Sequence, residues 1–133
     1  MSGENTELVR RVAALFNEVD VDAALDFAAD DFVMDWSNSI GPLRGVYEGH
    51  DGVRDLFDAF SEAWEEIKWE PLEITELDDD HVLVVNHVRM RGKGSGEEVD
   101  ATGAQIWTLR DGVGRRITLY QSKAEALEAT GLA

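Results

Sequence analysis

The side chains that could carry out chemistry are few in this sequence and lie far apart. The 133 residues include no cysteine, which excludes a cysteine nucleophile, a thiolate metal site and a disulfide framework. The three histidines, His50, His81 and His87, form no cluster with Asp or Glu at metal-ligand spacing. The glycine-rich segment 93–96 joins two predicted strands, whereas a phosphate-binding loop would open a helix. We therefore expect no metal and no other cofactor.

Three polar residues are candidates for catalysis. Asp35 lies on a strand predicted over residues 31–37, and the amide of Gln105 can donate a hydrogen bond to a carbonyl. His87 lies two residues before Arg89 on another predicted strand, and inside a cavity the two would serve as a general base and an anion clamp. On the opposite face they would belong to a dimer contact or to a solvated surface.

The chain is strongly acidic. Its 28 Asp and Glu against 12 Lys and Arg give a formal net charge of −16. This argues against nucleic acid or a membrane as partner, because phosphate binding needs a basic face. No apolar run approaches the roughly 20 residues of a membrane span, and the polar first residues do not resemble a signal peptide. We expect a cytoplasmic protein whose acidity either keeps it soluble or reflects adaptation to high salt.

Helical periodicity marks the first half of the chain, which we expect to fold as one domain over residues 1–133. Asn5 or Thr6 is the expected cap of a first helix, and a short second helix follows Asp20 or Asp22. Apolar residues at helical spacing define the buried face of the first helix, namely Leu8, Val12, Leu15, Phe16 and Val19.

A third helix is expected to begin near His50 or Asp51, after a loop over residues 38–49. Its apolar stripe comprises Val53, Leu56, Phe57, Phe60 and Trp64. The simplest interpretation of this stripe is core packing.

Alternating patterns predict the sheet. Strands are expected over residues 31–37, 67–77, 81–91, 98–109 and 115–121. The alternation slips at Pro71, which indicates a bulge or an edge strand, and Ser122 begins a final short helix that ends at Gly131. The fold class is α+β, with three N-terminal helices packed on a strongly curved antiparallel sheet. Such a cone leaves a cavity between the third helix and the inner sheet face.

The register of one hairpin decides which residues face that cavity. If the loop over 93–96 turns at Gly94–Ser95, Gln105 lies opposite Val84. The same side of the sheet then carries Val84, Asn86, Val88, Met90, Gly103, Gln105 and Trp107, and the other side carries Leu83, Val85, His87, Arg89 and Arg91. One additional loop residue would exchange the two faces.

We expect the cavity to bind a small apolar organic molecule. The predicted lining is Trp36, Tyr47, Phe57, Asn86, Gln105 and Trp107. Trp36 could instead belong to the core, and Tyr47 could cover the core from the surface.

Five segments resemble the nuclear transport factor 2-like superfamily, in particular its SnoaL-like, polyketide cyclase-like branch. They are FAADDFVMDW (27–36), GVYEGHDGVRDLF (45–57), RGKGSGEEV (91–99), IWTLRDG (106–112) and YQSKAEALEATGL (120–132). The resemblance covers nearly the whole chain and implies a cystatin-like cone. It also implies a homodimer formed through the outer sheet face. This fold hosts isomerases, cyclases, dehydratases, epoxide hydrolases and modules without activity.

The acid and base positions of these enzymes are not matched here. In the ketosteroid isomerases that the chain resembles, the base position falls on Trp36 and the protonated acid on Gln105, while a supporting tyrosine falls on Phe57. The strand-borne aspartate of SnoaL-type cyclases falls at or near Gln105 as well.

The other related chemistries also lack their residues. Epoxide hydrolases of this kind need two aspartates bridged by an arginine, and no aspartate stands two residues from Arg89 or Arg91. The dehydratases need two histidines with an aspartate, and that set is not assembled. Cofactor-free isomerase, cyclase or hydrolase-type chemistry and a non-catalytic binding or dimerisation module therefore both stay open.

Overall fold

Two helices, two strands and a third helix precede four consecutive strands and a final helix. The computed structural model describes residues 3–18, 20–39 and 43–131. The elements are α1 (Glu4–Asn17), α2 (Val21–Leu25), β1 (Ala28–Asp35), β2 (Val46–Glu48), α3 (Gly49–Ala63), β3 (Trp64–Glu76), β4 (His81–Gly92), β5 (Glu98–Arg110), β6 (Val113–Tyr120) and α4 (Lys123–Thr130).

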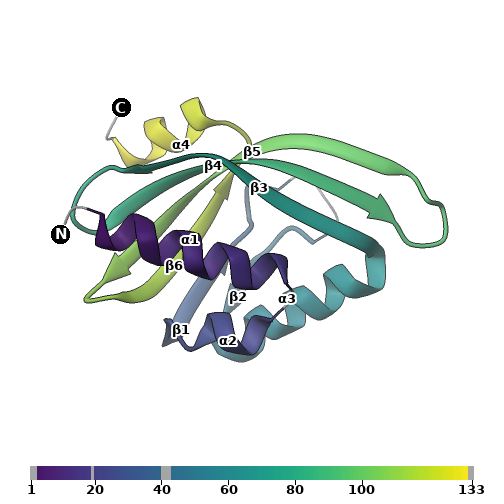
Figure 1. Cartoon of the computed structure of the whole chain (residues 1–133), viewed down its shortest axis with the longest axis horizontal. Helices are drawn as coiled ribbons and strands as arrows, with labels where there is room; N and C mark the ends of the chain where they lie inside the picture. The colour runs from purple at the N-terminus through teal and green to yellow at the C-terminus, as the bar shows by residue number, and fades with distance from the viewer. Residues whose placement is uncertain (1–2, 19, 40–42, 132–133) are drawn as a thin grey trace.

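The strands form one six-stranded sheet in the order β2-β1-β6-β5-β4-β3, which bends around the N-terminal helices (Figure 1). The predicted α+β class is confirmed. The sheet is not antiparallel throughout, because β1 and β6 pair in parallel while the other neighbours are antiparallel. The exception arises from topology, since α3 carries the chain from β2 to the far edge and the meander then returns to β1.

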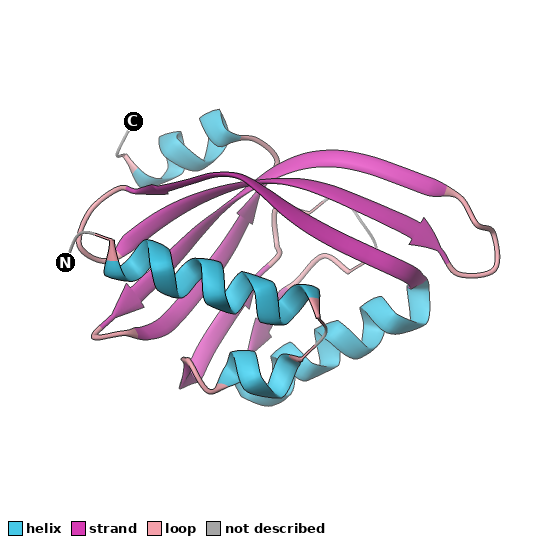
Figure 2. Cartoon of the chain, in the orientation of Figure 1, coloured by secondary structure: helices cyan, strands magenta, loops and turns pink. Residues whose placement is uncertain are grey.

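Helices cover both faces of the sheet unequally (Figure 2). The apolar stripes of α1 and α3 pack with α2 and the inner sheet face in the main core, which includes Val9, Val12, Phe16, Val53, Leu56, Phe57 and Phe60. On the outer face, α4 places Ala126 against Leu83, Ala104 and Ile106 in a second, smaller cluster. The sheet therefore curves around α1, α2 and α3, which pack on its inner face.

Local sequence signals placed the start of α2 and both ends of α4 correctly. Asp20 caps α2 by accepting from the amide of Ala23, and Ser122 caps α4 by accepting from the amide of Glu125. The cap expected at Asn5 or Thr6 is wrong, because the left-handed Gly3 precedes α1. Val19, expected on the same helix, lies outside the described residues.

Two further expectations fail where long-range pairing outweighs the local pattern. Trp64 fits the stripe of α3, but it adopts an extended conformation and begins β3 opposite Gly92. The loop expected over 38–49 contains β2, which pairs with β1 through Met34 and Tyr47. Residues 40–42 of that loop lie outside the described residues.

The register between β4 and β5 is the predicted one. Val84 lies opposite Gln105 and Asn86 opposite Gly103. The connection is longer than a two-residue turn, because Gly92 pairs with Glu97 through its backbone N–H and also accepts from Gly96. The faces on which the side chains lie are unaffected, since Arg91 and Glu98 pair in the same register as Val84 and Gln105.

Candidate functional site

A hollow lies between the inner sheet face and the N-terminal helices, as two adjoining cavities. The outer cavity has a volume of about 270 Å³ and the inner one about 30 Å³. Four residues line both, namely Trp36, Trp69, Asn86 and Gln105. The outer cavity lies along the hairpin of β4 and β5, where Val88, Met90, Val99 and Ala101 face it.

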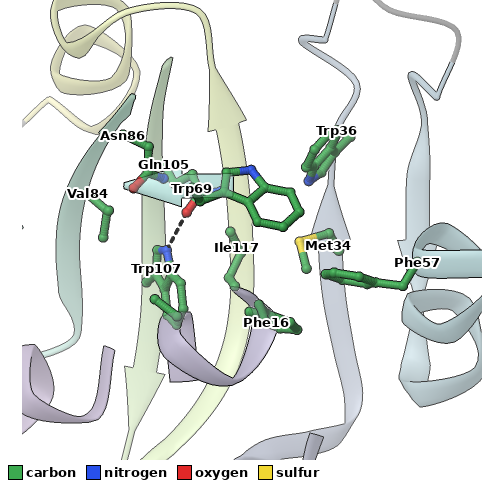
Figure 3. Close-up of a pocket in the computed structure, with 11 residues that line it drawn as sticks. Phe16, Met34, Trp36, Phe57, Trp69, Val84, Asn86, Gln105, Trp107 and Ile117 are labelled. Carbon is green, nitrogen blue, oxygen red and sulfur yellow. Dashed lines mark hydrogen bonds between the residues drawn. The ribbon is translucent and has the colours of Figure 1, made fainter. Parts of the chain in front are cut away.

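Aromatic side chains make up much of the cavity wall. Phe16 and Phe57 stack with ring centroids 5.0 Å apart in the inner cavity (Figure 3). Phe60 meets Trp36 edge-on at 5.1 Å and Trp69 at 5.7 Å. Offset and edge-to-face pairs of this kind hold rings in fixed orientations. The wall is therefore an apolar surface of firmly placed rings.

Strand alternation brings two amides into this apolar surface. Asn86 follows Val84 on the inner face of β4, and Gln105 lies opposite Val84 on β5. The side-chain oxygen of Gln105 accepts a hydrogen bond of 2.8 Å from the indole Nε1 of Trp107, drawn as a dashed line in Figure 3. Asn86 is only 5% exposed, and among the described residues its side chain has no hydrogen-bond partner. The cavity thus contains one oriented amide and one unpaired amide.

Trp36 adds a third polar group. Its indole Nε1 is buried and has no hydrogen-bond partner in the described part of the chain. Figure 3 shows this nitrogen on the ring edge that faces the other lining residues. Buried polar groups in native proteins are mostly paired, so an exception marks a place where a ligand or water completes the hydrogen bond.

The edge strand β3 is held in place by α1. The side chain of Asn17 donates to the carbonyl oxygen of Trp69 at 2.7 Å and accepts from its backbone N–H at 2.9 Å. These two hydrogen bonds replace the partner strand that the edge lacks. They fix the backbone of a residue that lines both cavities.

The described lining offers no charged side chain. Of the described residues, no Asp, Glu, Lys, Arg or His lines either cavity, and Tyr120 is the one ionisable lining residue. Its side chain belongs to the outer-face cluster beneath α4. Burial, with help from the charge of Asp35, raises the pKa of the Tyr120 hydroxyl. Among the described residues there is also no group of three or more His, Asp or Glu suited to a metal ion.

The structure places two of the three catalytic candidates outside the cavity. The interpretation in which His87 and Arg89 enter the cavity is wrong. His87 lies on the outer face, where its Nε2 is 2.9 Å from a carboxylate oxygen of Asp100, and Arg89 is exposed. The reason is the alternation of β4, which directs Asn86 and Val88 inward and the residues between them outward.

Asp35 also lies on the outer face, one residue from Trp36. Partial burial opposes its ionisation, but hydrogen bonds from the hydroxyl and backbone N–H of Ser37 and from Arg116 outweigh this and lower the pKa of the carboxyl group. Asp35 therefore joins β1 to β6 as a structural anion. Gln105 alone of the three candidates lines the cavity.

The predicted lining is present except for one residue. Trp36, Asn86 and Gln105 line both cavities, and Phe57 and Trp107 line the inner one. Tyr47 lines neither, because β2 holds it beside β1 and its hydroxyl donates to the carbonyl oxygen of Leu43 at 2.8 Å. Whether these residues bind a ligand stays a prediction.

Sequence reasoning missed several aromatic and aliphatic lining residues, namely Phe60, Trp64, Trp69, Val99 and Leu119. One signal for Trp69 was present, since it alternates with Ile67 on the predicted strand. All four tryptophans of the chain line one cavity or the other.

Comparisons with known proteins agree with this architecture. A model of the SnoaL-like domain family matches residues 9–120. None of the curated protein sequences matches the chain. No helix in the described residues is long and apolar enough to cross a membrane.

Solved structures resemble almost the whole chain. TerC, co-crystallised with polyporic acid, is 21% identical, with 95% of this chain and 97% of that chain covered and a TM-score of 0.80. An NTF2-like protein of unknown function from Burkholderia pseudomallei is 22% identical over 96% and 97% of the two chains, with a TM-score of 0.79. A putative polyketide cyclase from Xanthomonas campestris pv. campestris is 20% identical over 94% and 95%, with a TM-score of 0.75. At these identities the likeness establishes the fold.

Proposed function

This chain belongs to the SnoaL-like domain family, and from that membership we propose that it binds a small, largely apolar organic molecule in the cavity between its curved sheet and the helices α1 and α3. One observation carries the proposal. The outer cavity of about 270 Å³ is walled mainly by aromatic and aliphatic side chains, and a few amides project from this wall into the cavity. Ligand sites in proteins have this composition, apolar walls with a small number of placed polar groups.

Binding is better supported than proton-transfer catalysis. A general base must lie within hydrogen-bond reach of the proton it removes. The described lining has amides and an indole but no carboxylate or imidazole. One observation favours the second candidate, cofactor-free isomerase, cyclase or hydrolase-type chemistry. The amide of Gln105 is oriented by Trp107, and a fixed donor of this kind can polarise a carbonyl.

Filling the cavity tests the binding proposal. Gly103 lies opposite Asn86 on β5, and an added Cβ there meets its nearest atom, the backbone oxygen of Tyr120, at an ordinary 3.5 Å. Gly103→Leu should therefore fold and occupy part of the outer cavity. The matched control is Thr108→Leu, which places the same side chain on the outer face of the same strand.

The readout is intrinsic tryptophan fluorescence during titration with the bicyclic hydrocarbon tetralin, since every tryptophan lies at the cavity. We expect a saturable signal for the wild type and for Thr108→Leu, and a weakened or lost signal for Gly103→Leu. Equal binding by Gly103→Leu, or no binding by the wild type, contradicts the proposal.

We also propose that the chain acts as a cytoplasmic homodimer. Helix α4 covers Leu83, Ala104 and Ile106, so the open part of the outer face lies around His87 and Arg89. Light scattering coupled to size-exclusion chromatography should give twice the chain mass of 14.8 kDa. Arg89→Glu should shift the population toward the monomer, and a monomeric wild type contradicts this.

A further inference from the structure

The polar groups of the cavity point to one kind of ligand, on the premise that the cavity binds a small organic molecule as proposed above. Three side chains, Trp36, Asn86 and Gln105, are named here the polar set. They lie in both cavities, at the boundary between them. Each has hydrogen-bonding capacity that the described part of the protein does not use.

The direction of the Gln105 amide is fixed by its neighbour. An indole N–H can only donate a hydrogen bond, so the atom of Gln105 that lies 2.8 Å from Nε1 of Trp107 must be its oxygen. The amide nitrogen is therefore on the other branch, with its two N–H groups free to donate. Trp107 is 5% exposed, so this arrangement is held within the core.

Trp36 offers a second donor and no acceptor. Its buried Nε1 has no partner among the described residues. The ring cannot easily turn the nitrogen elsewhere, because Phe60 packs edge-on against it at 5.1 Å. The unpaired amide of Asn86 adds donors and one acceptor, and this residue is 5% exposed. Donors therefore predominate in the polar set.

The charges of the described lining and of the whole chain disfavour an ionic ligand. No described lining side chain is a cation that could pair with an anionic ligand, and none is a carboxylate that could pair with a cationic one. Moving an ion out of water without a counter-charge is strongly unfavourable. The net charge of −16 further opposes the approach of anions.

We infer that the ligand is a neutral, ring-containing molecule with at least one carbonyl-type oxygen, which accepts hydrogen bonds from Trp36 and Gln105 while its rings pack against the aromatic wall. Asn86 then pairs with a second polar atom of the same ligand. Trp107 is a positioning residue, because it acts through Gln105. These four residues determine specificity in a site whose described lining has no charged side chain.

Three probes with one carbon skeleton test this inference. Tetralin has no polar atom, α-tetralone adds a carbonyl, and the anion of tetralin-carboxylic acid adds a charge. Isothermal titration calorimetry measures each affinity without relying on the tryptophans that the variants remove. We expect the wild type to bind α-tetralone at least about fivefold more tightly than tetralin, since one net hydrogen bond is worth about that factor. We expect the anion to bind weakest.

Variants then assign the selectivity to residues. Gln105→Met and Trp36→Phe keep the approximate shape but remove a donor, so each should reduce the preference for α-tetralone over tetralin by about fivefold. Trp107→Phe keeps the donors of Trp36, Asn86 and Gln105 but frees the Gln105 amide to rotate. It should therefore weaken the same preference. Thr108→Leu should retain the wild-type preference.

The outcomes separate this inference from the proposal beneath it. If no probe binds the wild type, the proposed function fails and the inference fails with it. If tetralin binds but α-tetralone binds no better, or if the anion binds best, binding stands and the neutral-carbonyl inference is overturned. If the preference exists but survives in Gln105→Met and in Trp36→Phe, with circular dichroism showing both variants folded, the polar set is not its source.

Discussion

Replacing Asn86 with leucine should stabilise the protein without ligand. In the wild type this amide is 5% exposed and unpaired among the described residues, between Pro71 on β3 and Gly103 on β5. A buried polar group without a partner costs about 1–3 kcal/mol. Leucine has a similar branched outline and no group that requires a hydrogen bond, and the adjoining cavity has room for its larger volume.

The magnitude follows from the size of the cavity. A volume of about 270 Å³ can hold water, and water that hydrogen-bonds to the amide recovers part of the cost. The lower end of the range is therefore appropriate, and Asn86→Leu should raise the free energy of unfolding by about 1 kcal/mol. For a chain of 133 residues this corresponds to a rise in Tm of about 4 °C.

Thermal and urea unfolding, followed by far-UV circular dichroism, measure the change. The matched variant Asn86→Asp should act in the opposite direction, because burial without a counter-charge raises the pKa of the new carboxyl group. The folded state then holds its proton to higher pH than the unfolded state, so the variant loses stability as pH rises from the ordinary aspartate range through the raised pKa. Thr108→Leu should change stability by less than about 0.5 kcal/mol.

A Tm of Asn86→Leu at or below that of the wild type would refute the reasoning. It would mean that the Asn86 amide has hydrogen-bond partners in solution that offset the free-energy cost of its burial. Because α-tetralone has no second polar atom for Asn86 to bind, the same variant should keep the preference for α-tetralone over tetralin.

Three other results are expected. Asn17→Ala removes both hydrogen bonds to Trp69 and should lower the free energy of unfolding by about 1–3 kcal/mol in urea titrations; an unchanged midpoint would show that water replaces the side chain fully. Asp35→Asn should cost about 1 kcal/mol at neutral pH, and because the pKa of Asp35 is lowered from 3.8, the difference from wild type should shrink below that pH and vanish below the lowered value. Molar KCl should raise Tm relative to dilute buffer by screening the net charge of −16, and equal Tm values would remove the high-salt explanation of the acidity.

The inward-facing residues could be predicted because they alternate along strands with a fixed register. Val84, Asn86, Val88 and Met90 lie at every second position of β4, and the hairpin sets the partner of Gln105. The packing of three helices on one sheet face predicted the curvature of the sheet, and the resemblance to a known family implied the same cone. Together these predicted part of the cavity lining without coordinates, including Asn86, Gln105 and Trp107.

The remaining features depend on contacts that sequence patterns do not contain. Trp64 fits helical spacing after Phe60, and only its pairing with Gly92 shows that the helix has ended. Tyr47 leaves the cavity because β2 pairs with β1, a contact set by tertiary structure. The sequence also did not predict which face of the sheet α4 covers. Ala126 is the one fully buried residue of α4, so this helix shows little apolar periodicity.

The Asn17 side chain also protects the molecule from its own copies. Strand β3 ends the sheet, and an outermost strand with free N–H and C=O groups can recruit a strand from another molecule and start aggregation. Asn17 occupies the N–H and C=O of Trp69 from within the same chain, and Pro71 two residues later has no N–H to donate. The outer edge of β3 therefore does not offer a continuous template for intermolecular β-pairing.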